Sequence, residues 1–191
     1  MVTEHNTPMH IIPRIDYTKI VSALEHYTRY GFTEIEAPWI ISHKAYVATR
    51  PSDREEFYTL GGYLNASGEQ SFIELMQSGV KLTKHICVTP CFRKEPVLDE
   101  IHFLYFLKAE LIDMDVSQEN LQSMISNALS FYKQYLDVSV IQTDTEGKAF
   151  DIVDTKHGIE LGSYGIRTYE NFSWIYGTGV ALPRLDIAIN K

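Results

Sequence analysis

The feature of this sequence that most constrains its fold is a run of strand-like segments in the C-terminal half with no room for helices between them. These segments cover residues 138–142, 149–153, 158–161, 164–168 and 173–176. Parallel strands need a crossover of a dozen or more residues, usually a helix, whereas short turns can join antiparallel strands. The spacing therefore predicts an antiparallel sheet and disfavours the alternation of strands and helices in a Rossmann domain.

Two segments carry the apolar periodicity of amphipathic helices. They cover residues 14–30 and 117–135, and the second begins at Ser117, a residue suited to an N-cap. Strand-like segments at 86–92 and 103–112 precede the second helix. The order of these elements predicts an α+β fold, in which helices pack against an antiparallel β-sheet.

Size and charge narrow the functional classes. The chain has 191 residues and no internal linker or repeat, so we expect one domain covering 1–191. Its formal net charge is −8. A protein that grips a nucleic-acid backbone by itself normally has a basic face, because the affinity comes from neutralising phosphates. The charge favours a small-molecule enzyme and disfavours, without excluding, tRNA as a partner.

The sequence also carries signals of location. No apolar run approaches the roughly 18 residues of a membrane span, and the first residues do not resemble a secretory signal. Cys87 and Cys91 are the two cysteines, and in a strand both would point to one face, too far apart for an easy disulfide. We expect buried, unreactive thiols and a cytoplasmic protein that does not contact a membrane.

Arg93 is the first candidate for a functional residue. It follows the apolar segment 86–92, and a turn-like stretch separates it from the next strand, so we expect a β-hairpin. An arginine at the end of a central strand needs an anionic partner, and a phosphate or carboxylate would satisfy its planar fork. Glu95, His102 and Glu110 belong to the same hairpin. The alternative is a surface hairpin held by salt bridges.

A second candidate segment is Gly177-Thr178-Gly179-Val180-Ala181, which is followed by Arg184. Alternating small residues allow a backbone to approach a flat ligand closely. An arginine at the following strand-to-helix junction could then bind a polyphosphate. The chain has no Gly-x-x-x-x-Gly-Lys-Ser/Thr sequence, so ATP, if used, is not held by a P-loop.

In order, these segments resemble the three signature motifs of class II aminoacyl-tRNA synthetases, over residues 14–188. A helix and strand ending at Pro38 resemble motif 1. Motif 2, of the form Phe-Arg-x-Glu followed by a loop and by Arg or His before a Phe, is matched by Phe92, Arg93, Glu95, His102 and Phe106. Motif 3, Gly-x-Gly-x-Gly-x-x-Arg, is matched by Gly177, Gly179, Ala181 and Arg184, with one change from glycine to alanine.

Residues 158–167 place the chain near one branch of this family. They resemble a stretch of aspartyl-tRNA synthetases and an equivalent stretch of ammonia-dependent asparagine synthetase. The match has departures, because Ile73 stands where aspartate-type enzymes have a lysine, and Lys108 where they have a glutamine. Both changes put aspartate in doubt as the substrate.

The resemblance implies a class II-type antiparallel sheet flanked by helices, ATP and Mg²⁺ as cofactors, and specific residue roles. Arg93 and Arg184 would be catalytic, and the ATP-binding set would be Arg93, Glu95, His102, Phe106, Gly179 and Arg184. The substrate-binding set would be Glu69, Gln70, Lys108, Glu110 and Arg167, and Glu160 and Ser163 would hold Mg²⁺, which prefers hard oxygen ligands.

The implied activity is ATP-dependent activation of an amino acid or similar carboxylic acid as its adenylate, followed by transfer to an amine, a carrier or tRNA. A homodimer through motif 1 is implied, and the chain has no room for an anticodon-binding domain. Two alternatives remain: a non-catalytic synthetase paralogue that binds amino acid or nucleotide to regulate a partner, and a relative of biotin and lipoate ligases. The last ranks low, because no Gly-Arg-Gly-Arg-type loop is present.

Overall fold

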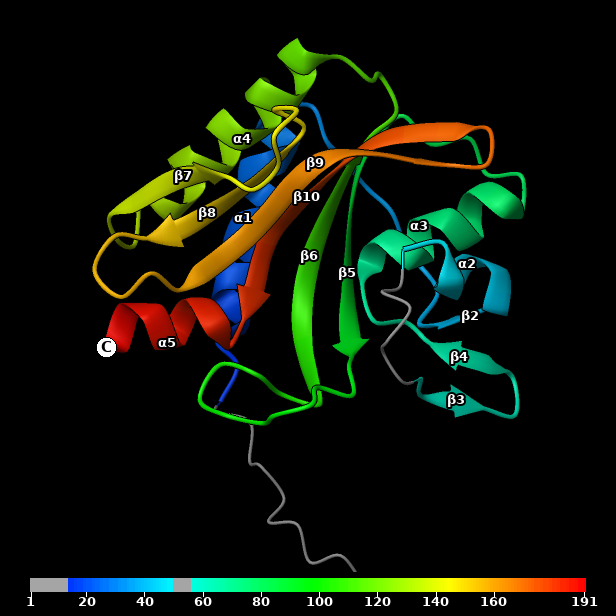
Figure 1. Cartoon of the computed structure of the whole chain (residues 1–191), viewed down its shortest axis with the longest axis horizontal. Helices are drawn as coiled ribbons and strands as arrows, with labels where there is room; N and C mark the ends of the chain where they lie inside the picture. The colour runs from blue at the N-terminus through cyan, green and yellow to red at the C-terminus, as the bar shows by residue number, and fades with distance from the viewer. Residues whose placement is uncertain (1–13, 50–55) are drawn as a thin grey trace, which may run out of the picture.

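A computed structural model describes residues 14–49 and 56–191 (Figure 1). Its helices are α1 (Tyr17–Arg29), α2 (His43–Val47), α3 (Gly68–Gln77), α4 (Gln118–Tyr132) and α5 (Arg184–Asn190). Its strands are β1 (Thr33–Glu34), β2 (Ile40–Ile41), β3 (Tyr58–Thr59), β4 (Gly62–Leu64), β5 (Lys84–Phe92), β6 (Tyr105–Asp113), β7 (Val138–Gln142), β8 (Ala149–Asp154), β9 (Glu160–Tyr169) and β10 (Phe172–Leu182).

In the described part of the chain, a large sheet of seven strands has the order β1-β5-β6-β10-β9-β8-β7. Every neighbouring pair is antiparallel except β1 and β5. The predicted α+β fold with an antiparallel sheet and flanking helices is therefore confirmed. A small sheet of order β2-β4-β3 lies beside α2 (Figure 1).

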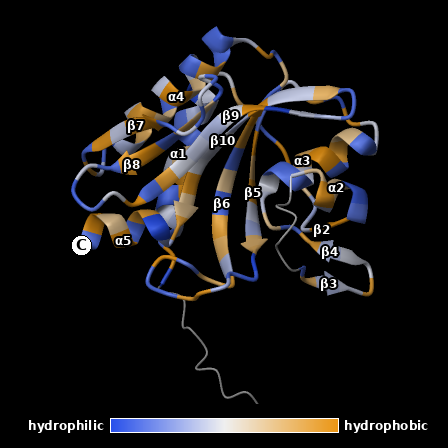
Figure 2. Ribbon diagram, viewed as in Figure 1, coloured by the Kyte–Doolittle hydropathy of each residue, from blue (hydrophilic) through white to orange (hydrophobic). Residues whose placement is uncertain are grey.

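Alternation along β6 divides the two faces of the large sheet. Leu107, Ala109 and Leu111 point toward α1 and α4 and belong to or pack against the larger hydrophobic core. Successive side chains of a strand point to opposite faces, and the hydropathy of β6 changes along its length accordingly (Figure 2). The even-numbered residues of β6 therefore lie on the opposite face, where α3 packs mainly against β5 and β6 of the large sheet.

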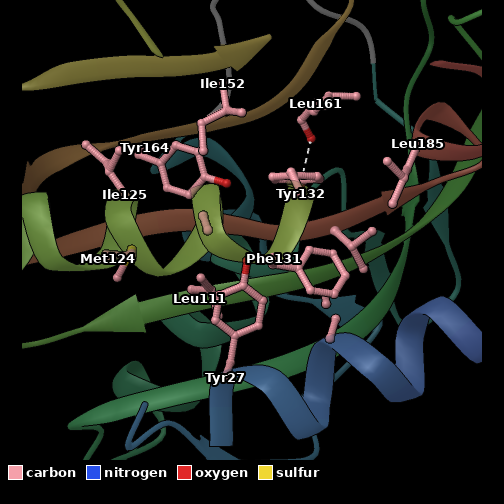
Figure 3. Close-up of a cluster of buried hydrophobic side chains, with 14 of the residues drawn as sticks. Tyr27, Leu111, Met124, Ile125, Phe131, Tyr132, Ile152, Leu161, Tyr164 and Leu185 are labelled. Carbon is pink, nitrogen blue, oxygen red and sulfur yellow. Dashed lines mark hydrogen bonds between the residues drawn. The ribbon is translucent and has the colours of Figure 1, made fainter. Parts of the chain in front are cut away.

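The larger core packs the sheet against α1 and α4. Tyr27 of α1 and Tyr132 of α4 are fully buried, and each hydroxyl donates a hydrogen bond to a carbonyl of the sheet; Figure 3 shows the bond from Tyr132 to Leu161. The Tyr132 hydroxyl lies 2.9 Å from the Leu161 oxygen, and the Tyr27 hydroxyl lies 3.0 Å from the Gly179 oxygen. Buried tyrosines usually find such partners, because an unsatisfied hydroxyl is costly.

Local sequence signals account for several element boundaries. Ser117 caps α4 by accepting a hydrogen bond from the Asn120 amide at 3.0 Å, as expected from the sequence. The expected segments 158–161 and 164–168 fall in one strand, β9, because the pairing with β8 continues from Glu160 to Gly165 and the pairing with β10 then runs from Tyr164 to Tyr169. The two cysteines are buried and unbridged, as expected.

No helix within residues 14–49 and 56–191 is both long enough and apolar enough to cross a membrane.

Candidate functional site

A cavity of about 250 Å³ lies over the face of the large sheet that α1 and α4 leave uncovered. Its walls come from α3 and its preceding loop, the β5–β6 hairpin, β9, β10 and the start of α5. The charged side chains that line it are Glu69, Arg93, Lys94, Lys108, Glu110, Glu160, Arg167 and Arg184. Segments separated by more than a hundred residues therefore contribute to one strongly charged cavity.

Arg93 and Arg184, from motifs 2 and 3, both line this cavity. Arg93 follows the end of β5, where its Nε donates to the Ala66 oxygen at 2.9 Å and its guanidinium carbon lies 5.0 Å from the centre of the Phe106 ring. Arg184 is the first residue of α5, and its Nη1 lies 3.5 Å from a carboxylate oxygen of Glu160. That contact is long for a charge-assisted hydrogen bond.

A narrow second cavity of about 10 Å³ is lined by Glu95, His102, Phe106 and Arg184 among others. Phe106 and Arg184 line both cavities. The structure thus brings together four of the six residues expected to bind ATP at this end of the sheet, and Arg93 contacts Phe106 beside them.

Asp99 holds His102 in place within the β5–β6 loop. The His102 Nδ1 lies 2.8 Å from the nearer Asp99 oxygen, and the backbone amides of Ile101 and His102 both donate to Asp99 at 2.8 Å. The Ile101 amide, and then the His102 side chain, lower the pKa of Asp99 to about 2. The loop geometry therefore depends on an ionised carboxylate.

At the opposite end of the large cavity, Glu69 and Arg167 form an ion pair between α3 and β9. Glu69 is buried, and its other oxygen accepts a hydrogen bond from the Trp174 indole nitrogen at 2.6 Å. Burial raises the pKa of Glu69, while the Arg167 charge opposes that shift. The Arg167 guanidinium also lies over the Tyr176 ring, 4.4 Å from its centre.

Lys108 and Glu110 occupy the middle of the cavity floor on β6. The Lys108 Nζ lies 2.9 Å from Glu110, and the Ser67 hydroxyl donates to the other Glu110 oxygen at 2.7 Å. Glu110 is almost fully buried, so both contacts are needed to compensate its desolvation.

Two residues that the sequence predicts for the site, Gln70 and Gly179, contact other parts of the protein in ways that stabilise the fold. Gln70 lines the cavity, but its side chain accepts from the Ala66 amide and donates to the Tyr46 oxygen, each at 2.8 Å. Gly179, expected to bind ATP, is absent from the lining of both cavities. A Cβ there would lie 3.1 Å from the Ala109 oxygen and 3.2 Å from the Tyr27 ring, so this glycine permits close packing against the core.

Glu160 and Ser163, the expected metal ligands, both line the cavity, and Asp151 of β8 pairs with Ser163 across the sheet. Burial and then the Glu160 charge raise the pKa of Asp151. Among the described residues, no group of three or more His, Cys, Asp or Glu side chains is placed to enclose a metal. Two carboxylates and a hydroxyl nevertheless fit Mg²⁺, which usually takes one or two protein carboxylates together with substrate phosphates.

Sequence reasoning missed Asp151, Tyr176 and Trp174. Asp151 and Tyr176 lie within predicted strands in positions that only the register across β8, β9 and β10 brings beside Ser163 and Arg167. Trp174 pairs directly with Arg167 in that register. Predicting a hairpin over residues 164–176, together with the position of its turn, would have fixed this register and placed Trp174 opposite Arg167.

No protein-family profile and no curated protein sequence matches the chain. Solved structures share its fold. PylSc, a pyrrolysyl tRNA synthetase from Desulfitobacterium hafniense, is 18% identical with a TM-score of 0.69, and the match covers 91% of this chain and 69% of that one. Seryl-tRNA synthetase from Pyrococcus horikoshii, complexed with ATP, is 18% identical with a TM-score of 0.74, and the match covers 90% and 49%.

A cytoplasmic serine-tRNA ligase from Naegleria fowleri, in complex with AMP, is 19% identical with a TM-score of 0.70, and the match covers 90% of this chain and 47% of that one. The chain thus has the fold of class II aminoacyl-tRNA synthetase catalytic domains and spans about half to two thirds of the length of these proteins. The branch indicated by residues 158–167 stays a prediction.

Proposed function

We propose that this chain binds ATP and an amino acid, or a similar carboxylic acid, in the large cavity and joins them as an acyl adenylate. The observation that carries the proposal is the convergence of Arg93 and Arg184 on one cavity. Their motifs lie about half the chain apart in sequence. Two guanidinium groups in one cavity can bind the oxygens of a polyphosphate and neutralise its charge. The similar structures that contain ATP and AMP support a nucleotide at this site.

The nucleotide would occupy the end of the cavity near Phe106. Its adenine would stack on the Phe106 ring, with Glu95 at the exocyclic amino group. His102 and Arg184 would bind the terminal phosphates, and Arg93 the α-phosphate. The long contact between Arg184 and Glu160 supports this arrangement, because a phosphate could replace a weakly held, half-exposed carboxylate at little cost.

The chemical step would be in-line attack of a substrate carboxylate oxygen on the α-phosphorus. A new oxygen–phosphorus bond forms, the bond from the α-phosphorus to the bridging oxygen breaks, and pyrophosphate leaves with the electron pair. A carboxylate needs no general base for this attack. Arg93 and Arg184 would supply positioning and compensation of negative charge, which are sufficient for such chemistry.

Glu160, Ser163 and the newly located Asp151 would hold Mg²⁺ at the edge of the cavity. Bound there, the ion would neutralise charge on the phosphates. The proximity of Asp151 and Glu160 supports this role: burial and then the Glu160 charge raise the pKa of Asp151, and a bound cation would offset that repulsion.

The acceptor of the activated acid would be an amine, a carrier or tRNA. We also propose a single catalytic domain that forms a homodimer through α1 and β1. The outer face of α1 supports such an interface, because Tyr17 and Val21 are more than half exposed there. Light scattering would test the dimer, and a monomer at micromolar concentration would contradict it.

ATP–pyrophosphate exchange with a panel of amino acids tests the proposed activity. Arg93→Ala and Arg184→Ala should each lower kcat/KM by about 10²- to 10³-fold, the loss typical of removing one group that stabilises transition-state charge. Lys133→Ala, an exposed cation after α4, is the matched control and should leave the rate unchanged. Nucleotide binding without exchange for any amino acid would instead favour a regulatory, non-catalytic protein.

A further inference from the structure

We infer that the substrate side chain ends in an uncharged carboxamide, as in asparagine or glutamine, and that Glu69 and Arg167 recognise it together. The inference rests on the proposed function, because it assigns the far end of the same cavity to the side chain of the acid that is activated. It selects one of the two substrate ends, carboxylate or amide, that an arginine at position 167 could bind.

The first argument is the charge balance at this end of the cavity. Arg167 on its own would attract a carboxylate, but its guanidinium is already paired with Glu69. Glu69 is buried, with 5% of its surface exposed, so its charge is poorly screened by water. A substrate carboxylate would therefore meet the Glu69 carboxylate, and a substrate ammonium would meet the Arg167 guanidinium.

The second argument is hydrogen-bonding capacity. Each Glu69 oxygen has one described contact, from Trp174 or from Arg167, and a carboxylate has about four acceptor positions. Arg167 has five N–H groups, and its side chain remains 35% exposed where it lines the cavity. The pair therefore presents an acceptor next to a donor. A carboxamide is complementary to both, since its oxygen accepts from Arg167 while its NH₂ group donates to Glu69.

The third argument is rigidity. Glu69 is fixed by the Trp174 indole, and the Arg167 guanidinium is held against the Tyr176 ring at 4.4 Å. A substrate carboxylate could displace Glu69 from Arg167 only by leaving a buried anion and the indole N–H without their partners. Leaving one member of a buried pair uncompensated is strongly unfavourable, so a charged substrate is rejected rather than accommodated.

The fourth argument is distance along the sheet. Glu110 pairs with Thr178 of β10, and Tyr176, which supports Arg167, is two residues further along that strand. Two residues of a strand span about 6.6 Å. If Glu110 binds the α-ammonium group, the Glu69–Arg167 pair lies within reach of a side chain of two or three carbons.

The decisive experiment compares each amide with its isosteric acid in ATP–pyrophosphate exchange: asparagine with aspartate, and glutamine with glutamate. The wild-type chain should use one of the amides with a kcat/KM at least tenfold above that of its acid, and above those of lysine and serine. Preference for either acid, for lysine or for serine would overturn the inference while leaving the proposed adenylation intact.

Two variants separate recognition from a merely structural role. Glu69→Gln keeps the shape of the side chain and an acceptor for Trp174, but it leaves the Arg167 charge free. We expect it to move the acid-to-amide ratio of kcat/KM at least tenfold toward the acid. Glu119→Gln, the same change on the exposed surface of α4, should leave the ratio unchanged. An unchanged ratio in a folded Glu69→Gln variant would overturn the inference.

Should no amino acid support exchange, the proposed adenylation fails, and calorimetry still decides the recognition. Asparagine, glutamine, aspartate and glutamate would each be titrated into the wild-type chain with ATP present. Tighter binding of an amide than of its acid, by at least tenfold, would support the inference. Equal or weaker binding of both amides, or no binding of any of the four, would overturn it.

Discussion

Replacement of Gly179 by alanine should weaken folding rather than ATP binding, although its motif suggested a role at the nucleotide. The new Cβ would lie 3.1 Å from the Ala109 oxygen and 3.2 Å from both the Ala109 Cβ and the Tyr27 ring. These contacts are tighter than normal van der Waals separation. Ala109 belongs to β6, which pairs with β10, and the hydroxyl of the fully buried Tyr27 donates a hydrogen bond to the Gly179 oxygen. Neither neighbour can therefore move away independently.

The magnitude follows from two opposing effects. Overpacking a buried site typically costs about 1 to 3 kcal/mol. Replacing glycine also restricts the unfolded chain, which returns roughly 0.4 to 1 kcal/mol. We therefore expect Gly179→Ala to lower the free energy of unfolding by about 1 to 2 kcal/mol. In a domain of this size each kcal/mol lowers Tm by roughly 2 to 4 °C.

Urea denaturation and calorimetric titration with ATP would measure the two quantities separately. Ala181→Gly is the matched variant, because Ala181 lies on the same strand but lines the cavity. It should change ATP affinity, at a stability cost of about 0.5 to 1 kcal/mol for glycine in a strand. The reasoning is refuted if Gly179→Ala retains wild-type stability and loses ATP affinity, since the glycine would then face the nucleotide.

Two further predictions concern charges around the cavity. Lys108→Met should lower the free energy of unfolding by about 3 kcal/mol, because it leaves the buried Glu110 carboxylate without its cation; urea denaturation would measure this, and a loss below 1 kcal/mol would contradict it. The pKa of Asp99 falls from 3.8 to about 2 on folding, so its stabilising effect is complete above pH 3.8 and is lost as the pH falls through 2. Stability measured between pH 5 and 2 should therefore decline less in Asp99→Asn than in the wild type, and parallel curves would show that Asp99 does not contribute.

The sequence predicted the sheet and its motifs better than the surroundings of individual side chains. The strands from β7 to β10 have strong patterns and short connections, so their antiparallel pairing follows from local signals, whereas the pairing of β6 with β10 joins segments far apart in the sequence. The short elements α2, β2, β3 and β4 were not predicted, because segments of two to five residues carry too little periodicity. Which face each residue of β10 presents also depends on a register shift between Thr178 and Val180, which no local pattern specifies.

That register shift explains why the motif 3 residues divide between two surroundings. Strict alternation would place 177, 179 and 181 on one face of β10. With the bulge between Thr178 and Val180, Gly179 packs against the core while Thr178 and Ala181 line the cavity. Bulges redirect side chains in this way and are frequent beside functional sites. The motif therefore coincides with a change of face within one strand.

The distribution of charge along the cavity reconciles an acidic chain with a proposed polyphosphate site. At the far end, Arg167 is closely paired with the buried Glu69, and in the middle the Lys108 ammonium lies 2.9 Å from the Glu110 carboxylate. At the Phe106 end, by contrast, the one ion pair described for Arg184 is its 3.5 Å contact with the half-exposed Glu160. Positive charge is thus compensated tightly where a neutral group would bind and loosely where phosphates would bind. Local pairing, and not the net charge of −8, determines which anions the cavity can accept.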